Sequence, residues 1–402
     1  MIRKIFYGWW IVLACALIGI YVGGIGFFGF TAFFEPIREE FGWSYTQISF
    51  ASSLRGLEMG LFAPFVGFLA DRFGSRKLIL YGTITVGFGL IFLGVTQSLA
   101  MFYGSFLLLA FGAGGCTVVV TMTAVANWFH KKVGIALGVM GSGFGAGGLM
   151  VPIIVRLIDL YQWRTTLMIL GLGMWALGIP LSLVIRNRPE QYGLFPDGEV
   201  SRDPIPDPEL QRKEKSIGFK EALKIRAFLY LNMVEGMRMV TITAVFTHVM
   251  PYLSSVGMPR STAGLVAGAM PLFSIIGRFG FGWLGDIFDK RHVMATVFCL
   301  ISLGMLAFGH VHMRWVIFPF LLLFPLGHGG SMVLRGSILR EYFGRDYFGR
   351  LLGIIMGSGA IGGIIGPTLT GWVFDTFGSY HNIWLVLSGL AGLTIVLILK
   401  IK

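Results

Sequence analysis

Long apolar runs separated by short polar turns follow one another along almost the whole chain. A run of about 20 apolar residues is long enough to cross the hydrocarbon core of a bilayer as a helix. Twelve such runs can be marked, and we predict a membrane-spanning helix on each of them. The predicted ranges are 8–33, 46–70, 77–96, 99–127, 132–155, 165–186, 227–253, 261–285, 292–311, 315–339, 350–374 and 381–400.

One long polar segment, from Arg186 to Lys224, interrupts this pattern near the middle of the chain. It is mixed in charge and rich in proline, which is typical of a linker. Residues 217–225 could form a short amphipathic helix with Phe219 and Leu223 facing the membrane, or could be plain linker. We therefore predict an N-terminal six-helix half over 1–188, a cytoplasmic linker over 189–224 and a C-terminal six-helix half over 225–402.

Lysine and arginine are distributed unevenly between the turns on the two sides of the predicted bundle. Cytoplasmic loops of membrane proteins carry an excess of these residues. The richer side holds Arg3, Lys4, Arg72, Arg76, Lys77, Lys131, Lys132, Lys290, Arg291, Arg340, Arg345, Arg350, Lys400 and Lys402. The opposite side holds Arg38, Arg156, Arg164, Arg260 and Arg314. This bias predicts a multi-pass protein of the inner (plasma) membrane with both termini in the cytoplasm.

Composition agrees with a protein whose outer solvent is lipid. Hydrophobic residues make up 55% of the chain and charged residues 13%, against about 25% charged residues in soluble domains. The net charge of +12 could suggest nucleic acid, but the topology of the loops already explains it. The first apolar run continues to Phe34, too far for a signal peptide, so we expect a retained helix.

The sequence contains no motif that indicates a metal site, a cofactor site or a nucleotide-binding site. The three cysteines lie inside apolar runs without paired or metal-ligand spacing. No phosphate-binding loop of the form G-x-x-x-x-G-K-[ST] is present, which argues against ATP as the driving force. We expect no catalytic residues, metal site or cofactor, and a carrier rather than an enzyme.

Two sequence patterns recur in the same order in both halves. The first half reads Gly67-Phe-Leu-Ala-Asp71-Arg72-Phe-Gly74-Ser-Arg76-Lys77, and the second reads Gly282-Trp-Leu-Gly-Asp286-Ile-Phe-Asp289-Lys290-Arg291. Farther on, Met140-Gly-Ser-Gly143 with Gly147 and Pro152 is echoed by Met356-Gly-Ser-Gly359 with Gly363 and Pro367. Parallel six-helix repeats of this kind are typical of the major facilitator architecture. The glycines should allow close helix approach, with or without a role in gating.

The first of these patterns resembles the signature loop G-x-x-x-D-R-x-G-R-K of the major facilitator superfamily. The resemblance implies an all-α membrane protein of twelve helices. Carboxylates beside cations at helix ends can form charge-assisted hydrogen bonds that latch neighbouring helices. We interpret these loops as a cytoplasmic gate formed by Asp71, Arg72, Arg76, Lys77, Asp286, Lys290 and Arg291.

Within the superfamily, the chain resembles bacterial monocarboxylate transporters and the oxalate/formate antiporter group. The resemblance rests on the stretch from Asn127 to Gly143, on Tyr7-Gly8-Trp9-Trp10, and on Arg188-Pro189-Glu190-Gln191-Tyr192-Gly193. Three positions depart from the pattern. No lysine lies between Leu351 and Asp375, as oxalate/formate antiporters would have. Ser274 stands where animal relatives have an aspartate, and Val118 stands where bacterial relatives often have a tyrosine.

Ionisable residues inside predicted spans cost about 2.5–3.5 kcal/mol each on insertion scales, so each requires a reason. Two pairs with i, i+3 spacing, Arg55 with Glu58 and Glu235 with Arg238, share one helix face. Each could be a structural ion pair, or its glutamate could exchange a proton during transport. His248 is a further candidate for such a charge relay, and His328 is a possible addition to the set.

Arg278 differs from these pairs because no acid lies three or four residues away in the sequence. A planar guanidinium presents a bidentate fork to a carboxylate, and the resemblance implies that this arginine binds the substrate. It could instead form an ion pair between helices. Arg335 lies about one turn from Arg340 and could extend toward the cytoplasmic end, so we favour gating over substrate contact for it.

The charge balance within the membrane suggests what the chain carries. This set contains four arginines and two glutamates. A surplus of positive charge inside the membrane favours binding of an anion. We expect a monomeric secondary carrier of a small organic anion, with a monocarboxylate first, working by proton symport or anion exchange. The alternatives are a proton-coupled carrier of a drug-like or neutral solute, and a transporter-like membrane sensor.

Overall fold

The computed structural model describes residues 6–57, 73–116, 118–129, 133–195, 197, 219–343 and 348–401. Throughout these residues the regular structure is helical, and no strand occurs in them. In a bilayer this is expected, because a helix satisfies its own backbone hydrogen bonds without water. Nine described segments are long and apolar enough to cross a membrane.

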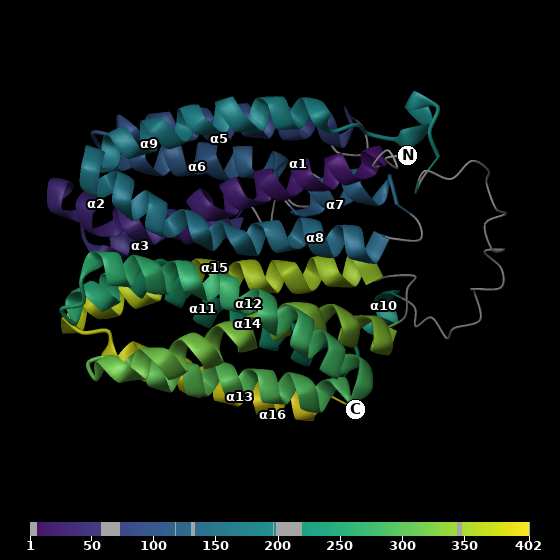
Figure 1. Cartoon of the computed structure of the whole chain (residues 1–402). Helices are drawn as coiled ribbons and strands as arrows, with labels where there is room; N and C mark the ends of the chain where they lie inside the picture. The colour runs from purple at the N-terminus through teal and green to yellow at the C-terminus, as the bar shows by residue number, and fades with distance from the viewer. Residues whose placement is uncertain are drawn as a thin grey trace. The chain divides into compact units, whose positions relative to one another are not determined.

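The chain separates into two compact units. Unit 1 comprises the described residues of Met1–Phe27 and Leu61–Lys213, and unit 2 those of Phe28–Gly60 and Glu214–Lys402. The helices of unit 1 are α1 (Tyr7–Val22), α5 (Ser75–Gly94), α6 (Leu99–Gly115), α7 (Val118–Ala126), α8 (Val133–Ala146) and α9 (Met150–Val184). Figure 1 shows α5 beside α9, and α1 packs along α8.

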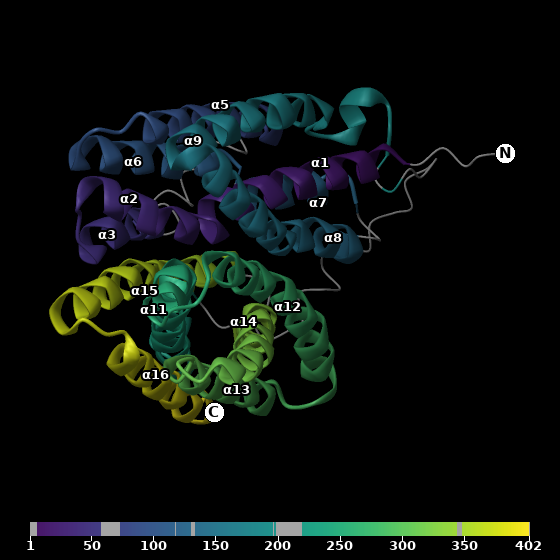
Figure 2. The same cartoon turned by 60° about the vertical axis from the view of Figure 1, so that its left-hand side comes forward.

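The helices of unit 2 begin before the middle of the first predicted half and resume after the linker. They are α2 (Phe34–Phe41), α3 (Tyr45–Leu57), α10 (Phe219–Ala222), α11 (Arg226–Ser255), α12 (Arg260–Ile287), α13 (Lys290–Gly309), α14 (Ile317–Phe343), α15 (Phe348–Phe377) and α16 (His381–Leu399). Within this unit α11 and α3 both pack on α15, α12 packs on α14, and α13 lies between α14 and α16 (Figure 2).

Most described helices begin within a few residues of the predicted spans. The helix predicted over 292–311, for example, is α13 at Lys290–Gly309. The boundary predicted between the spans 132–155 and 165–186 is wrong, because α8 ends at Ala146 and α9 runs from Met150 to Val184 through the predicted turn, with its break at Gln162. Of the linker residues that the structure describes, Pro189–Tyr192 form a 3-10 helix and Phe219–Ala222 form α10. Residues 217 and 218 of the amphipathic helix considered for 217–225 lie outside the described residues.

The long helix α9 contains a sharp break. Gln162 has φ 63° and ψ 162°, far from helical values, and this region is rarely occupied by residues other than glycine. Helical structure continues on both sides of it, so a single residue reverses the chain. Next to it, the Arg164 guanidinium donates from Nη1 to the Gly94 carbonyl at 2.9 Å and lies over the Trp163 ring.

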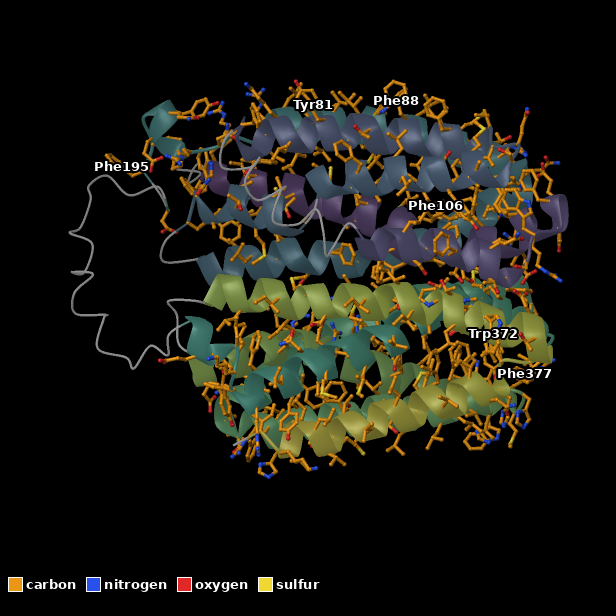
Figure 3. All side chains as sticks on the ribbon, turned by 180° about the vertical axis from the view of Figure 1, so that it is seen from behind. Tyr81, Phe88, Phe106, Phe195, Trp372 and Phe377 are labelled. Carbon is orange, nitrogen blue, oxygen red and sulfur yellow. The ribbon has the colours of Figure 1, made fainter. Side chains whose placement is uncertain are left out.

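The outward faces of many helices are apolar. Tyr81 and Phe88 of α5 are 65% and 45% exposed, and Figure 3 shows them projecting away from the helix. Trp372 and Phe377 of α15 are likewise exposed. Large apolar side chains on this many faces suit a surface in contact with lipid.

Candidate functional site

A buried ion cluster on α11 and α14 lies at the centre of the site in unit 2. The Arg238 guanidinium donates from Nε to Glu235 Oε2 at 2.8 Å and from Nη2 to Oε1 at 2.7 Å. Arg335 of α14 donates to the same Oε1 from Nη1. Both side chains of the α11 pair are 4% exposed. A carboxylate buried this deeply requires full pairing, and two guanidiniums supply it.

This arrangement confirms the predicted i, i+3 ion pair of Glu235 with Arg238. It also corrects the expectation that Arg335 extends toward the cytoplasmic end, because its guanidinium instead reaches the carboxylate on α11. The physical reason is the cost of burial: an intramembrane carboxylate attracts the second cation more strongly than distant solvent does.

The face of α14 that bears Arg335 also carries two other polar residues, one and two turns earlier. Ser331 Oγ lies 3.4 Å from Arg238 Nη1 and donates to the His328 carbonyl at 2.7 Å. His328 is buried, with its ring edge-on to Phe246 of α11. The residues at 328, 331 and 335 share one helix face, so this face of α14 is polar where it meets α11.

Arg278 on α12 lies close to the same face. A Cβ added at Gly329 would overlap the Ser274 carbonyl oxygen and lie 2.9 Å from the Arg278 amide nitrogen. Only a glycine permits the α12 and α14 backbones to approach this closely. The charges of Arg238, Arg278 and Arg335 all act on His328. Among the described residues, three arginines therefore act on His328, and two of them, Arg238 and Arg335, pair with Glu235.

The glycine pattern of the second half borders the cluster from α15. A Cβ at Gly359 would lie 3.2 Å from both Cγ and Oε1 of Glu235, and one at Gly362 would overlap the Gly236 carbonyl. Beside them, Ser358 Oγ donates to Asn232 Oδ1 at 2.7 Å. The prediction that these glycines allow close helix approach is confirmed. Asn232 was not predicted as a site residue, although its spacing of three from Glu235 places it on the same face of α11.

The first half uses its copy of the pattern in the same way inside unit 1. A Cβ at Gly143 of α8 would lie 2.5 Å from the Ala16 carbonyl oxygen of α1. One at Gly147 would lie 2.6 Å from the Gly24 amide nitrogen. The glycine repeat thus joins α8 to α1 as it joins α15 to α11.

His248 lies on α11 but not in the ion cluster. It is 13 residues after Glu235, which is about 20 Å along the helix axis. Its Nε2 is 2.9 Å from the Pro367 carbonyl oxygen and 3.0 Å from Ser49 Oγ, and its Nδ1 is 3.0 Å from the Tyr380 hydroxyl. The Pro367 carbonyl can only accept, so Nε2 carries a proton, and in the neutral ring Nδ1 accepts from Tyr380. The structure therefore separates His248 from Glu235 and Arg238, the other predicted relay residues whose side chains it describes.

The predicted gate residues of the second half lie at the ends of α12 and α13. Lys290 Nζ is 2.6 Å from Glu341 Oε2, which connects α13 to the end of α14. Arg291 pairs with Asp289 at 2.7 Å and donates from Nη1 to the Ile401 carbonyl at 3.0 Å. The hydrogen bonds from the Arg291 side chain and amide hold the pKa of Asp289 well below its usual range. Asp286 is exposed near the end of α12.

The remaining predicted gate residues lie in the first half. Arg76 and Lys77 occupy the first turn of α5, where the Arg76 amide donates to Asn187 Oδ1 at 3.0 Å. Asp71, Arg72 and Glu58 lie outside the described residues, as does the side chain of Arg55. These four predictions remain predictions.

The start of the linker is bound to the helix ends of unit 1. The Arg186 guanidinium lies over the rings of Tyr7 and Tyr192, 4.2 Å and 4.0 Å from their centroids. Trp128 Nε1 donates to the Arg186 carbonyl at 2.9 Å, and Tyr7 donates to the Val184 carbonyl at 2.9 Å. Three stretches that carried the resemblance, at the first helix, after the fourth and in the linker, therefore meet at one place.

Comparisons with known proteins agree with this geometry. The family model described as Major Facilitator Superfamily matches residues 16–253 and 233–402. The chain is 25% identical over 398 residues to monocarboxylate transporter 12-B of Danio rerio, covering 93% of this chain and 82% of that protein. It is 27% identical over 383 residues to the MFS-type transporter YcxA of Bacillus subtilis, covering 92% and 89%.

A solved structure shares the fold. A bacterial homolog of the human lysosomal transporter Spinster, in an inward-facing and unoccupied conformation, matches with a TM-score of 0.73. The match covers 98% of this chain and 95% of that chain at 16% sequence identity. Fold, family model and relatives define the class, a multi-pass membrane transporter. The chain belongs to the Major Facilitator Superfamily and is similar to its monocarboxylate transporters.

Proposed function

We propose that this transporter carries a small organic anion, specifically a monocarboxylate, by alternating access of two six-helix halves. The observation that supports this is the buried carboxylate of Glu235, paired with Arg238 and Arg335, with Arg278 of α12 acting on the neighbouring His328 of α14. Arg278 comes from a third helix and is the cation that we assign to the substrate carboxylate. The names of the relatives agree with this class of substrate.

The membrane topology of the chain is part of the proposed function. We infer twelve membrane-spanning helices, an inner (plasma) membrane location and cytoplasmic termini, supported by the lysine and arginine bias of the loops. Glu235 is the described carboxylate that could take up a proton when its arginines engage an anion. Proton symport therefore needs Glu235, whereas anion exchange does not.

The proposal is tested by uptake of labelled lactate, pyruvate, oxalate and formate into proteoliposomes. We expect Arg278→Ala to lower the initial rate for the transported monocarboxylate at least tenfold. Arg278→Lys should restore part of it, because an ammonium keeps the charge but loses the bidentate fork. Arg156→Ala, which removes an exposed arginine of α9, is the matched control and should transport at the wild-type rate.

Uptake by Arg278→Ala at the wild-type rate for every anion would show that the anion-site assignment is wrong. An imposed pH gradient, acidic outside, separates the two modes of coupling. Uptake that rises with the gradient supports symport, and uptake that needs an anion inside the vesicle supports exchange.

A further inference from the structure

Three of the seven histidines of the chain lie together where α13 ends and α16 begins. His310 and His312 belong to the turn that follows α13, and His381 is the first residue of α16. The ring centroids of His310 and His381 are 5.3 Å apart with the ring planes at 87°, and those of His310 and His312 are 5.9 Å apart. None of the three was predicted as a site residue. Since imidazole is the commonest metal ligand among protein side chains, this end of unit 2 brings metal-binding groups together.

The last turn of α13 orients two of these rings. His310 Nδ1 lies 2.8 Å from the Leu306 carbonyl oxygen, and His381 Nδ1 lies 2.8 Å from the Gly309 carbonyl oxygen. The carbonyl groups in the last turn of a helix have no partner within the helix. A carbonyl can only accept, so each Nδ1 carries a proton and each neutral ring keeps a lone pair on Nε2. Histidines that bind metals are held in the same way, with the other ring nitrogen donating to a carbonyl or a carboxylate.

The Nε2 atoms are the part of the two rings that a ligand can use. Neither has a hydrogen-bond partner among the residues that the structure describes, and both side chains are half-buried. Two imidazoles on one tetrahedral zinc ion hold their ring centroids about 5 Å apart, because each Zn–N bond is about 2.0–2.1 Å long. The spacing of His310 and His381 is therefore that of two rings which share one ion.

This pair provides fewer ligands than a resident metal centre. In the described part of the chain, no group of three or more histidine, cysteine, aspartate or glutamate side chains is placed to hold a metal ion. Structural zinc sites use four protein ligands and catalytic zinc sites use three. Two ligands with water in the remaining positions hold an ion that exchanges with the medium. His312 is exposed on the adjoining turn, and rotation of its side chain would add a third ligand.

We propose that His310 and His381 bind a divalent transition-metal ion, zinc or copper, between the ends of α13 and α16. Imidazole nitrogen suits these ions, whereas magnesium and calcium prefer oxygen ligands. The C-terminal end of α13 also favours positive charge. Arg314 on the following turn opposes it, but this side chain is exposed and solvent screens its charge. We therefore depart from the sequence-based expectation of no metal site.

The ion would connect two helices that already pack together. Phe308 of α13 packs on Trp384 of α16 with ring centroids 4.9 Å apart, and Ser302 Oγ donates to the Ser388 carbonyl at 2.9 Å. Both helices belong to unit 2, so a bridge between them restricts no motion between the two units. An ion that binds only the folded chain stabilises it by mass action. We therefore expect the metal to raise the unfolding temperature without stopping transport, whatever the substrate is.

Zinc binding to the full chain in detergent, purified without a polyhistidine tag, tests the proposal. Equilibrium dialysis against radioactive zinc should show saturable binding at micromolar concentration, and excess magnesium should not displace the zinc. His310→Asn and His381→Asn each keep a donor for the carbonyl of α13, because the asparagine amide replaces Nδ1, but they lose Nε2. Each should lower the zinc affinity about tenfold or more, since loss of an outer-shell partner alone costs about 10–100-fold.

His292→Asn is the matched control, because His292 is an exposed histidine in the first turn of α13, at the other end of the helix. It should keep the wild-type zinc affinity and the zinc-dependent rise in unfolding temperature, which His310→Asn and His381→Asn should both lack. His312→Asn should lose less affinity than either, and a loss as large as theirs would contradict a two-ligand site.

Three results would overturn the proposal. The first is the absence of saturable zinc binding to the wild-type chain, and the second is unchanged affinity in His310→Asn and His381→Asn. The third is an equal loss of affinity in His292→Asn. Each variant is compared only if it elutes as a single species in detergent, and if one of the two ligand variants does not fold, the other decides.

Discussion

The helix pairs α1–α8 and α11–α15 use the same glycine pattern, but only the second pair encloses charge. At the matched positions Gly143 and Gly359, a Cβ would meet the Ala16 backbone in unit 1 and the Glu235 side chain in unit 2. Both pairs are close-packed through glycine. The repeat therefore specifies how the helices approach, and a few residues outside the repeat specify what lies between them.

The two helix pairs suit two different tasks of a transporter, movement as a rigid body and interaction with a charged solute. Close packing without charge, as in α1–α8, suits a rigid element that moves as a body. Close packing around Glu235, Arg238 and Arg335 imposes a charge balance that a bound anion can alter. Under the proposed function, solute chemistry belongs to α11, α12 and α14, and the comparison can be tested by substitutions at matched positions.

The largest effect is expected from Glu235→Gln. Loss of the charge leaves two buried guanidiniums without their counter-ion, and breaking a buried ion pair in this way costs about 3–5 kcal/mol. Denaturation in mixed micelles measures the free energy of unfolding. Ala16→Ser at the uncharged counterpart should change it by less than about 1 kcal/mol. Equal effects at the two positions would show that Glu235 is no more important to its helix pair than Ala16.

A smaller and symmetrical effect is expected at the glycines themselves. Gly362→Ala and Gly143→Ala each insert a methyl group against a backbone carbonyl of the neighbouring helix, and such overpacking typically costs about 1–3 kcal/mol. Gly138 and Gly357 have no atom within 4 Å of an added Cβ. Their alanine variants should therefore be neutral or slightly more stable. Thermal unfolding of the four variants checks this, and a loss confined to one half would argue against shared packing.

The smallest effect concerns the serine inside the repeated Met-Gly-Ser-Gly sequence. Ser358 bonds Asn232 on the partner helix, whereas Ser142 donates to Gly138 of its own helix at 2.8 Å. Ser358→Ala should cost about 1 kcal/mol and Ser142→Ala less than about 0.5 kcal/mol. Unfolding curves of the two variants measured side by side test this, and an equal loss would mean that the hydroxyls are equivalent.

The sequence predicted the helices well because each apolar run is a local signal. α13 and α16 begin within two residues of their predicted starts. The pair of Glu235 with Arg238 was predictable for the same reason, because a spacing of three fixes one helix face. The partner of Arg335 was not predictable, since it lies 100 residues away in the chain. Likewise, the contacts of Asp375 with the amides of Tyr45 and Thr46 were not predictable, because those residues lie 330 and 329 positions away in the chain.

The reversal of the chain at Gln162 has a consequence for how the protein is made. Gln162 is the one residue of α9 with non-helical backbone angles, so almost no non-helical chain separates its two arms. With so short a connection, we expect both arms to enter the bilayer together as a helical hairpin.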